Sequence, residues 1–382
     1  MAAPGRRIVP GMHIAPSPRT RTSNPSLAAA AWSALTIALG LWWWVWPAQY
    51  PFPPGPGDPV GTLLDVVAPA AVPPALVGAG IAGLVVALLA RAGRAAGLVV
   101  PTSVAWVLVF GLAVPGLRPL TLVGYLMAMF GPVVLFVTVL AGAWRWRGGP
   151  VAVGVFALVG AAAWATGIAD GVVLRRYLGV IGATVHLAGP SVLMAFFLGG
   201  ALVWAVVGAR TAPRGAGRPA WTRPEAAARW GRAATVVAGL CALPYGLLRM
   251  TWLTPWPFGM DPAEFVTAPE MRLHGLLLGL AALAGALLTT GLVARWGEVW
   301  PRWMPVVRGR PVPVAAAVVP GGVVAALFTV AAVPMVVMAV ESDEPWILIV
   351  FPFGVWGPAL GIAVLGYALR RSGHAAGTIE GS

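Results

Sequence analysis

Charged side chains are scarce in this chain. Only 10% of its 382 residues are charged, whereas 59% are hydrophobic and the mean hydropathy is +0.84. A soluble globular protein has about 25% charged residues, which it needs to cover a water-facing surface. The composition therefore excludes a soluble globular domain and predicts that a lipid bilayer is the solvent.

Cysteine and the common catalytic motifs are also nearly absent. Cys241 is the only cysteine and lies in an apolar run, which excludes an internal disulfide and a Cys-based metal cluster. The chain has no HExxH motif, phosphate-binding loop, aspartate-rich diphosphate-binding motif or paired carboxylates within an apolar run. We therefore predict no catalytic residue, no metal site and no cofactor, and we lean towards a protein that is not an enzyme.

Lysine is missing altogether, so all 25 basic residues are arginines, against 12 acidic residues, for a net charge of +13. Such a basic balance can indicate nucleic-acid binding. We reject nucleic acid as a partner, because the arginines are spread over many short loops and form no patch on one folded domain. Anionic headgroups are the expected counterions, and membrane lipids are the expected partners.

Long apolar runs are what the chain has in abundance. Runs of about 20 residues without period-two alternation predict transmembrane helices and exclude a barrel of strands. We predict an all-α, polytopic membrane helix bundle of about ten transmembrane helices. The expected spans are 27–46, 66–90, 98–117, 120–143, 151–169, 180–207, 233–256, 271–293, 314–340 and 346–369.

The stretch Ala294–Pro313 fixes the predicted orientation. It reads ARWGEVWPRWMPVVRGRPVP and holds four arginines and three tryptophans between two apolar runs. Indole prefers the headgroup layer, and arginine on a short loop stays on the cytoplasmic side. Placing this stretch inside puts 20 of the 25 arginines inside and 9 of the 12 acidic residues outside. We expect a bacterial cell-membrane protein with both termini in the cytoplasm.

The first four and last four spans look like two copies of one unit. Trp46-Pro47 parallels Trp256-Pro257, and Gly131-Pro132 parallels Gly357-Pro358. This predicts a 4+2+4 arrangement with a parallel internal repeat, as some transporters have; the alternative is a chance alignment of common Gly-Pro pairs. The expected segments are a disordered cytoplasmic tail (1–26), the first four-helix repeat (27–147) and a two-helix connector with a basic cytoplasmic loop (148–232). The second four-helix repeat (233–371) and a disordered tail (372–382) follow.

A few polar residues near the outer end of the second unit are candidates for binding a ligand. Arg249 lies about two turns before the outer end of its span, and a charge at such depth is costly and usually faces the bundle interior or water. With Arg249 as the anchor, the set could bind an anionic or zwitterionic ligand. The alternative is that Arg249 snorkels to the surface and pairs with Glu270 or Glu264. The candidates are Arg249, Asp261, Glu270, Arg272 and His274, with His186 as a lone histidine that would more often serve helix packing.

A second candidate set lies in the inner-face loop. Arg295, Glu298 and Arg302 are spaced i, i+3 and i+7, so a helical extension of the eighth span would place them on one face. We expect Glu298 to pair with Arg295 or Arg302. The alternative is a docking site for a partner or for a lipid headgroup.

The segments Arg295–Glu298, Pro301–Pro305 and Gly309–Pro313, together with LPYGLLRMTW at Leu243–Trp252, resemble a family of uncharacterised multi-pass membrane proteins from actinobacteria. The resemblance covers roughly residues 233–310. It brings no activity, so it supports the topology and leaves the function open.

The sequence leaves three kinds of function in competition. We expect an integral membrane protein that binds or transports a small amphiphilic or anionic molecule. The alternatives are a membrane-embedded enzyme acting on a lipid or isoprenoid, for which Glu270, Arg272 and His274 are the only candidates, and a structural subunit of a membrane complex with an unknown protein partner.

The predicted orientation is testable with a cysteine placed at Gly217 in the basic loop. A thiol reagent that cannot cross the bilayer should leave it unlabelled in intact cells and label it after permeabilisation, because the loop is expected to face the cytoplasm. A cysteine at Gly259, in the expected outer loop, is the control. Labelling of the Gly217 cysteine in intact cells would invert the topology.

Overall fold

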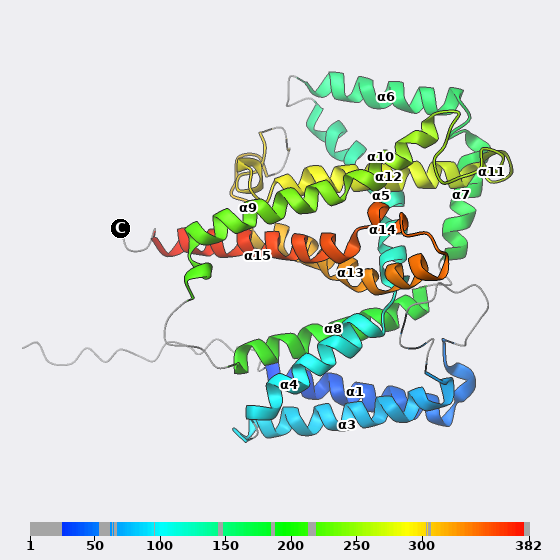
Figure 1. The fold of residues 1–382 in the computed structure, drawn as a ribbon. Helices are drawn as coiled ribbons and strands as arrows, with labels where there is room; N and C mark the ends of the chain where they lie inside the picture. Colours follow the sequence, from blue (N-terminus) through cyan, green and yellow to red (C-terminus); the bar gives the residue numbers. More distant parts are fainter. Residues whose placement is uncertain are drawn as a thin grey trace, which may run out of the picture.

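The computed structural model describes residues 25–377 except 53–61, 63, 65–66, 95, 144–147, 185–187, 213–218, 303 and 305–306. Within this part the chain forms helices joined by loops (Figure 1). The only pairing of extended backbone there is an isolated antiparallel bridge between Val299 and Pro311.

Eight helical segments of the described part are long and apolar enough to cross a membrane. Bulky apolar side chains stay exposed along them, such as Val134, 62% exposed, and Leu240, 58% exposed, as expected for faces solvated by lipid. The protein is therefore an integral membrane protein with an all-α, polytopic helix bundle. The eight segments are Pro25–Val45 (α1), Pro69–Arg91 (η2, Pro69–Ala71, and α3, Val72–Arg91), Arg118–Ala143 (α5), Gly189–Thr211 in α8 (Ala188–Thr211), Pro224–Leu253 (α9, Pro224–Cys241, α10, Leu243–Met250, and η6, Thr251–Leu253), Pro269–Thr290 (α12), Val314–Glu341 (α13) and Ile347–Arg371 (α14, Ile347–Val350, and most of α15, Phe353–Gly377).

Two further predicted spans are shorter. They are Gly97–Ala113, made of α4 (Ala96–Trp106) and a π-helical turn η3 (Val107–Ala113), and Gly149–Ala165 in α6. About 17 residues of helix reach roughly 25 Å, less than the roughly 30 Å hydrocarbon core. The expected count of ten is therefore met only if both short helices also cross.

Several predicted boundaries were wrong. The span expected over 180–207 is divided between α7 (Gly171–Thr184) and α8, and α15 continues past Arg371 to Gly377. The span expected over 233–256 is broken after Cys241, because Pro244 lacks the N–H that a continuous helix requires. Thr222 donates its hydroxyl to the Pro219 carbonyl at 2.8 Å, and Arg223 takes the cap position of α9.

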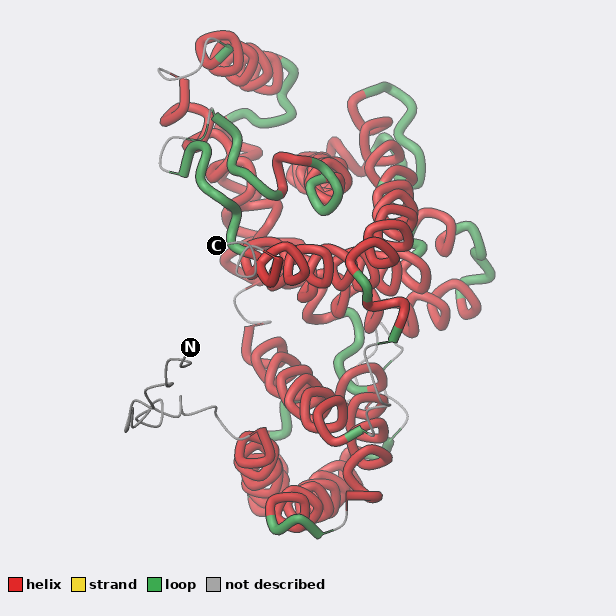
Figure 2. Tube along the Cα trace, turned by 90° about the vertical axis from the view of Figure 1, so that its left-hand side faces the viewer, coloured by secondary structure: helices red, strands yellow, loops and turns green. Residues whose placement is uncertain are grey.

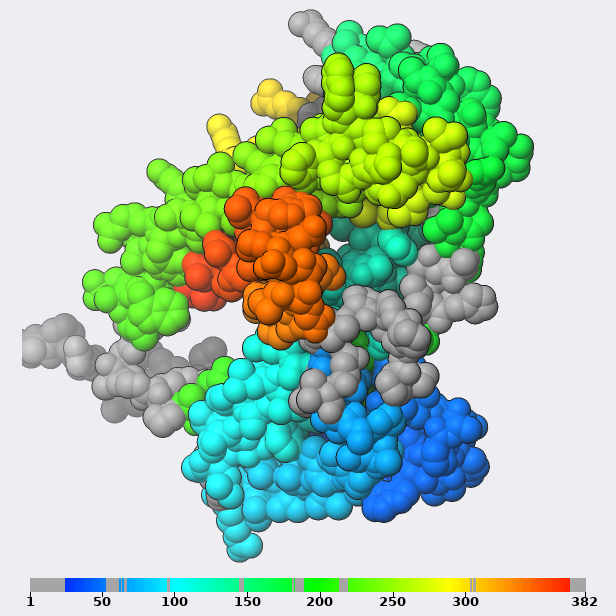
Figure 3. Space-filling view, turned by 45° about the vertical axis from the view of Figure 1, so that its right-hand side comes forward, coloured from blue at the N-terminus to red at the C-terminus, as the bar shows by residue number. Residues whose placement is uncertain are grey.

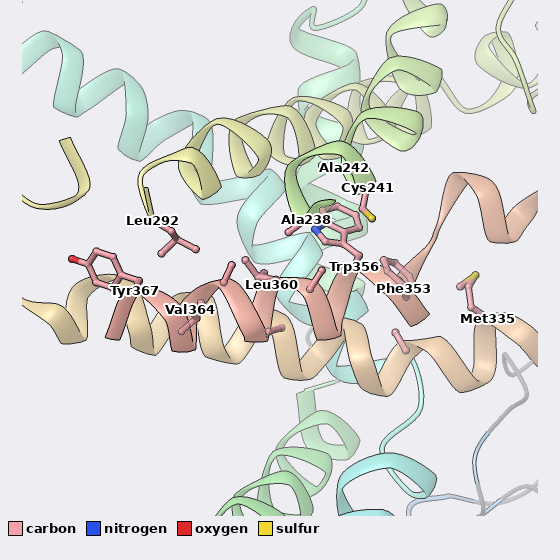
Figure 4. Close-up of a cluster of buried hydrophobic side chains, with 14 of the residues drawn as sticks. Ala238, Cys241, Ala242, Leu292, Met335, Phe353, Trp356, Leu360, Val364 and Tyr367 are labelled. Atoms are coloured by element: carbon pink, nitrogen blue, oxygen red, sulfur yellow. The ribbon is translucent and has the colours of Figure 1, made fainter. Parts of the chain in front are cut away.

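The helices form two bundles with separate apolar cores. The first bundle is α1, α3, α4 and α8, and the second is α9, α12, α13 and α15 (Figures 1 and 2). Trp32, Phe197 and Trp204 are buried in the first core, and Trp356, Leu360 and Tyr367 in the second (Figure 4). A space-filling view shows the bundles as two masses (Figure 3).

The remaining long helix, α5, crosses steeply between these groups and packs against α6, α12 and α8. The fourth helix of the first bundle is α8. Helix α5 is therefore not one of the four helices of the first bundle, whereas α15 is one of the four helices of the second. The four-helix repeat and the division at 147, 232 and 371 stay predictions, and residues 1–24 lie outside the described part.

One end of the molecule gathers most of the arginines that lie at or beside helix ends. On the left of Figure 1, α3, α8, α12 and α15 end, and α4, α9 and α13 begin. We name this the arginine-rich end. The opposite end holds α7, α10 and the short helix α11 (Glu264–Thr267). That the arginine-rich end faces the cytoplasm stays a prediction.

Glycines let α1 and α3 approach closely. A Cβ added at Gly80 would stand 2.8 Å from the Ser33 carbonyl oxygen and 3.0 Å from the Ile37 nitrogen, both of them backbone atoms. Helices in lipid associate mainly through such close contacts, because apolar surface gains nothing by leaving hydrocarbon.

Replacing Gly80 by Ala should therefore destabilise the first bundle by about 1–3 kcal/mol, the usual cost of overpacking. The measurement is the apparent melting temperature in detergent. Gly78→Ala on the same helix is the matched control, because no atom lies within 4 Å of its added Cβ. Equal behaviour of the two variants would contradict the assigned α1–α3 contact.

Candidate ligand-binding site

Three glycines bring α10 and α12 together at the end opposite the arginine-rich end. A Cβ at Gly246 would stand 2.6 Å from Leu283, and one at Gly275 or Gly279 would overlap Trp252 or Arg249. Gly275 and Gly279 form a GxxxG pair on one face of α12, a spacing that favours close helix contact in membranes. Arg249 and Trp252 are thus pressed against α12.

Arg249 has no charged partner in the part of the chain that the structure describes. Its guanidinium carbon lies 4.0 Å from the ring centre of Trp252 and 5.1 Å from that of Tyr245. Its Nε is buried and has no hydrogen-bond acceptor there. The expected alternative of a pair with Glu270 or Glu264 is wrong, because neither carboxylate forms an ion pair with it.

Arg272 binds the backbone of Trp252, the residue over whose ring Arg249 lies. Its Nε donates to the Trp252 carbonyl at 2.8 Å, and its guanidinium carbon lies 5.3 Å from the Phe265 ring centre. The Trp252 indole, 2% exposed, donates to the Phe258 carbonyl at 3.1 Å. The first bond holds the backbone of Trp252 and the second holds its ring, so Arg272 is a positioning residue for Trp252.

His274 lies where α5, α7 and α12 meet. Its ring centre is 4.6 Å from that of Tyr125, and its Nδ1 is 3.3 Å from the Tyr177 hydroxyl. Burial, with a smaller effect of Tyr125, raises the pKa of Tyr177, so this phenol stays protonated. A neutral imidazole that accepts at Nδ1 carries its proton on Nε2, which is buried and has no partner in the described residues.

Glu270 of α12 forms an ion pair with Arg176 of α7. Its Oε2 lies 4.0 Å from Nη1 of Arg176, and the same nitrogen donates to the Thr267 carbonyl at 3.3 Å. The carboxylate is 16% exposed, and Oε2 accepts no hydrogen bond from the described chain. Arg176 therefore balances the charge of Glu270, while its oxygen keeps an acceptor position open.

The other two candidates do not join this group. Asp261 is exposed and accepts from the Ala263 N–H at 2.9 Å, which closes its own turn. His186 lies outside the described residues. Arg249 and Arg272 thus lie where α12 meets α10 and η6, whereas Glu270 and His274 lie on the side of α12 that meets α5 and α7; the charge of Arg249 still acts on His274.

Three polar side-chain atoms on these two sides of α12 have no hydrogen-bond partner in the described residues: Arg249 Nε, His274 Nε2 and Glu270 Oε2. Buried polar atoms are normally hydrogen-bonded, and each exception calls for an explanation such as a missing ligand or water. No group of three His, Cys, Asp or Glu side chains in the described residues could hold a metal ion. The arrangement therefore suits a small ligand with acceptor atoms.

The inner-face loop differs from its prediction. The expected helical extension is wrong, because α12 ends at Thr290 and the chain forms a hairpin-like turn with Trp300 N bonded to Arg310 O at 2.9 Å. Glu298 pairs with Arg370 of α15 at 3.1 Å rather than with Arg295 or Arg302, which are exposed. A helix would have aligned the three residues; the hairpin separates them.

The end of α15 holds this hairpin through backbone carbonyls. The Tyr367 hydroxyl donates to Gly297 O at 2.7 Å, Arg370 donates to Leu292 O at 2.9 Å, and Arg371 donates to Val312 O at 2.9 Å. A cavity of about 20 Å³ beside Arg232, Tyr367 and Arg370 has the size of one water. This region is built for structural support and has no room for an organic ligand.

Arg370→Gln should loosen the hairpin, because it removes the Glu298 ion pair and weakens the bond to Leu292. A loss of about 1–2 kcal/mol corresponds to roughly 5- to 30-fold more opening. Limited chymotrypsin digestion in detergent, read at Trp296, measures it. Arg302→Gln, an exposed arginine of the same loop, is the control; if it accelerates cleavage as much, the clamp is not the cause.

Comparisons of the chain with protein-family models, with curated proteins and with solved structures found no match, so the functional argument rests on the geometry of the chain itself.

Proposed function

We propose that the protein binds a small amphiphilic anion at the α10–α12 junction, as a binding or transport protein of the membrane. The observation that supports this is Arg249, a cation in a membrane-spanning segment whose buried Nε has no acceptor and whose charge has no carboxylate partner in the described residues. A charge at such depth is costly unless it is paired, and such residues mark ligand pathways by default.

The donor pattern favours an anion. Arginine presents its N–H groups in a planar fork that matches a carboxylate or phosphate. His274 is close enough for the charge of Arg249 to act on it, and the guanidinium carbon of Arg249 lies over the rings of Trp252 and Tyr245 rather than against a carboxylate. A neutral ligand would leave the charge of Arg249 uncompensated.

The surroundings of Arg249 favour an apolar tail on that anion. On the same two helices Leu247 is 58% exposed and Leu280 is 52% exposed. Both residues lie within membrane-spanning segments, so their exposed faces meet lipid tails. A molecule with an anionic head can therefore place its chain along these faces while its head contacts Arg249.

The test uses tritiated oleyl phosphate as the probe and the full-length protein in lipid nanodiscs. Arg249→Gln should weaken its binding about 10- to 100-fold, since a hydrogen bond to a charged group is worth about 1.5–3 kcal/mol. Arg249→Lys keeps the charge without the fork and should lie between the two. Equilibrium binding by scintillation proximity gives the dissociation constants.

Two controls separate this site from general attraction to a basic protein. Arg175→Gln removes an exposed arginine of α7, at the same end as Arg249, and should leave binding unchanged. Unlabelled oleyl alcohol, which has the same chain and no charge, should not compete. Binding that survives Arg249→Gln, or that oleyl alcohol displaces equally well, would refute the proposal.

A further inference from the structure

A hollow of about 310 Å³ lies at the beginning of α9, at the arginine-rich end. It is formed because the 3₁₀ turn η5 (Ala220–Thr222) folds beside the first turns of that helix. Its lining residues are Ala220, Trp221, Arg223, Glu225, Ala226 and Arg229. This site is independent of Arg249, which lies near the other end of the same long segment.

The charge of the hollow is positive. Arg223 and Arg229 are exposed and form no ion pair within the described chain, and Glu225 is the one carboxylate of the lining. Arg232 follows one turn after Arg229 and is also exposed. In contrast, Arg370 and Arg371 at the same end are already engaged with the inner-face hairpin. The arginines of the hollow are therefore available to a ligand, whereas Arg370 and Arg371 are not.

Tryptophans place the hollow at headgroup depth. The Trp230 indole donates to the Trp221 carbonyl at 3.0 Å, and the Trp221 side chain is 54% exposed beside the hollow. About two turns further along α9, Val236 is 56% exposed on a surface solvated by lipid tails. Indole prefers the layer between tails and water, so the lining meets lipid headgroups.

We propose that this hollow binds the headgroup of an anionic phospholipid of the phosphatidylglycerol type. Arg223 and Arg229 bind the phosphate, as guanidinium groups do with bidentate geometry. Trp221 lies at the interface beside the glycerol backbone of the lipid. The carboxylate of Glu225 accepts a hydrogen bond from a hydroxyl of the headgroup, which is a contact that a choline headgroup cannot make.

The experiment compares lipid retention by the full-length protein and its variants. Each protein is placed in nanodiscs of equal parts phosphatidylglycerol and phosphatidylcholine, and native mass spectrometry counts the lipids that stay bound. The wild type should retain phosphatidylglycerol preferentially. Because a hydrogen bond from an arginine to a charged phosphate changes affinity by about ten-fold, R223Q/R229Q should lower the ratio by about 100-fold.

Arg308 and Arg310 supply the matched control, because they are exposed arginines at the same end, in the inner-face hairpin. R308Q/R310Q removes the same charge and should keep the preference. R223K/R229K, which preserves the charge, should retain part of it. Melting temperatures in detergent confirm that all variants are folded.

Three results would overturn the proposal: no preference in the wild type, equal loss in both glutamine double variants, or displacement of the lipid by soluble glycerol 3-phosphate at equal concentration. The last result would identify a soluble phosphate as the occupant. None of them bears on Arg249, whose variant should keep the lipid preference.

Discussion

A bilayer contains no water to bind polar groups, so every buried donor and acceptor must find its partner within the chain or in a ligand. At the arginine-rich end this requirement is met by α15. Tyr367, Arg370 and Arg371 donate to carbonyls of the loops that follow α12 and precede α13, where no helix satisfies the backbone. Charged residues there serve first to hold a loop against the second bundle.

The same requirement is not met at the opposite end. Arg272 satisfies the Trp252 carbonyl and Arg176 balances Glu270, yet Arg249 keeps its charge without a carboxylate in the described residues. The close contact of Trp252 with Gly275 fixes the aromatic face below the guanidinium. The chain thus supports the cation with aromatic rings and supplies no carboxylate for it within the described residues. This difference between the two ends connects the architecture to the proposed function.

Glycine decides how closely the helices approach in both bundles. Gly80 meets the backbone of α1, Gly275 meets Trp252 of η6, and Gly279 meets Arg249 of α10. In water, apolar burial would dominate such contacts; in lipid it does not, and backbone approach and dispersion take its place. Much of the surface of α5 and α6 stays apolar and exposed, since lipid rather than protein covers it.

The sequence by itself determined the class and the approximate position of most spans, because hydropathy and charge act over whole segments and need no partner. It also indicated that Arg249, Glu270, Arg272 and His274 share one end. Only the tertiary structure decided their contacts: that Glu270 faces Arg176, that Tyr125 and Tyr177 enclose His274, and that Glu298 pairs with Arg370. These partners come from other helices, and helical spacing describes neighbours on one helix alone. It failed at Glu298 because α12 ends before the loop, where the chain reverses and α15 supplies the bonds.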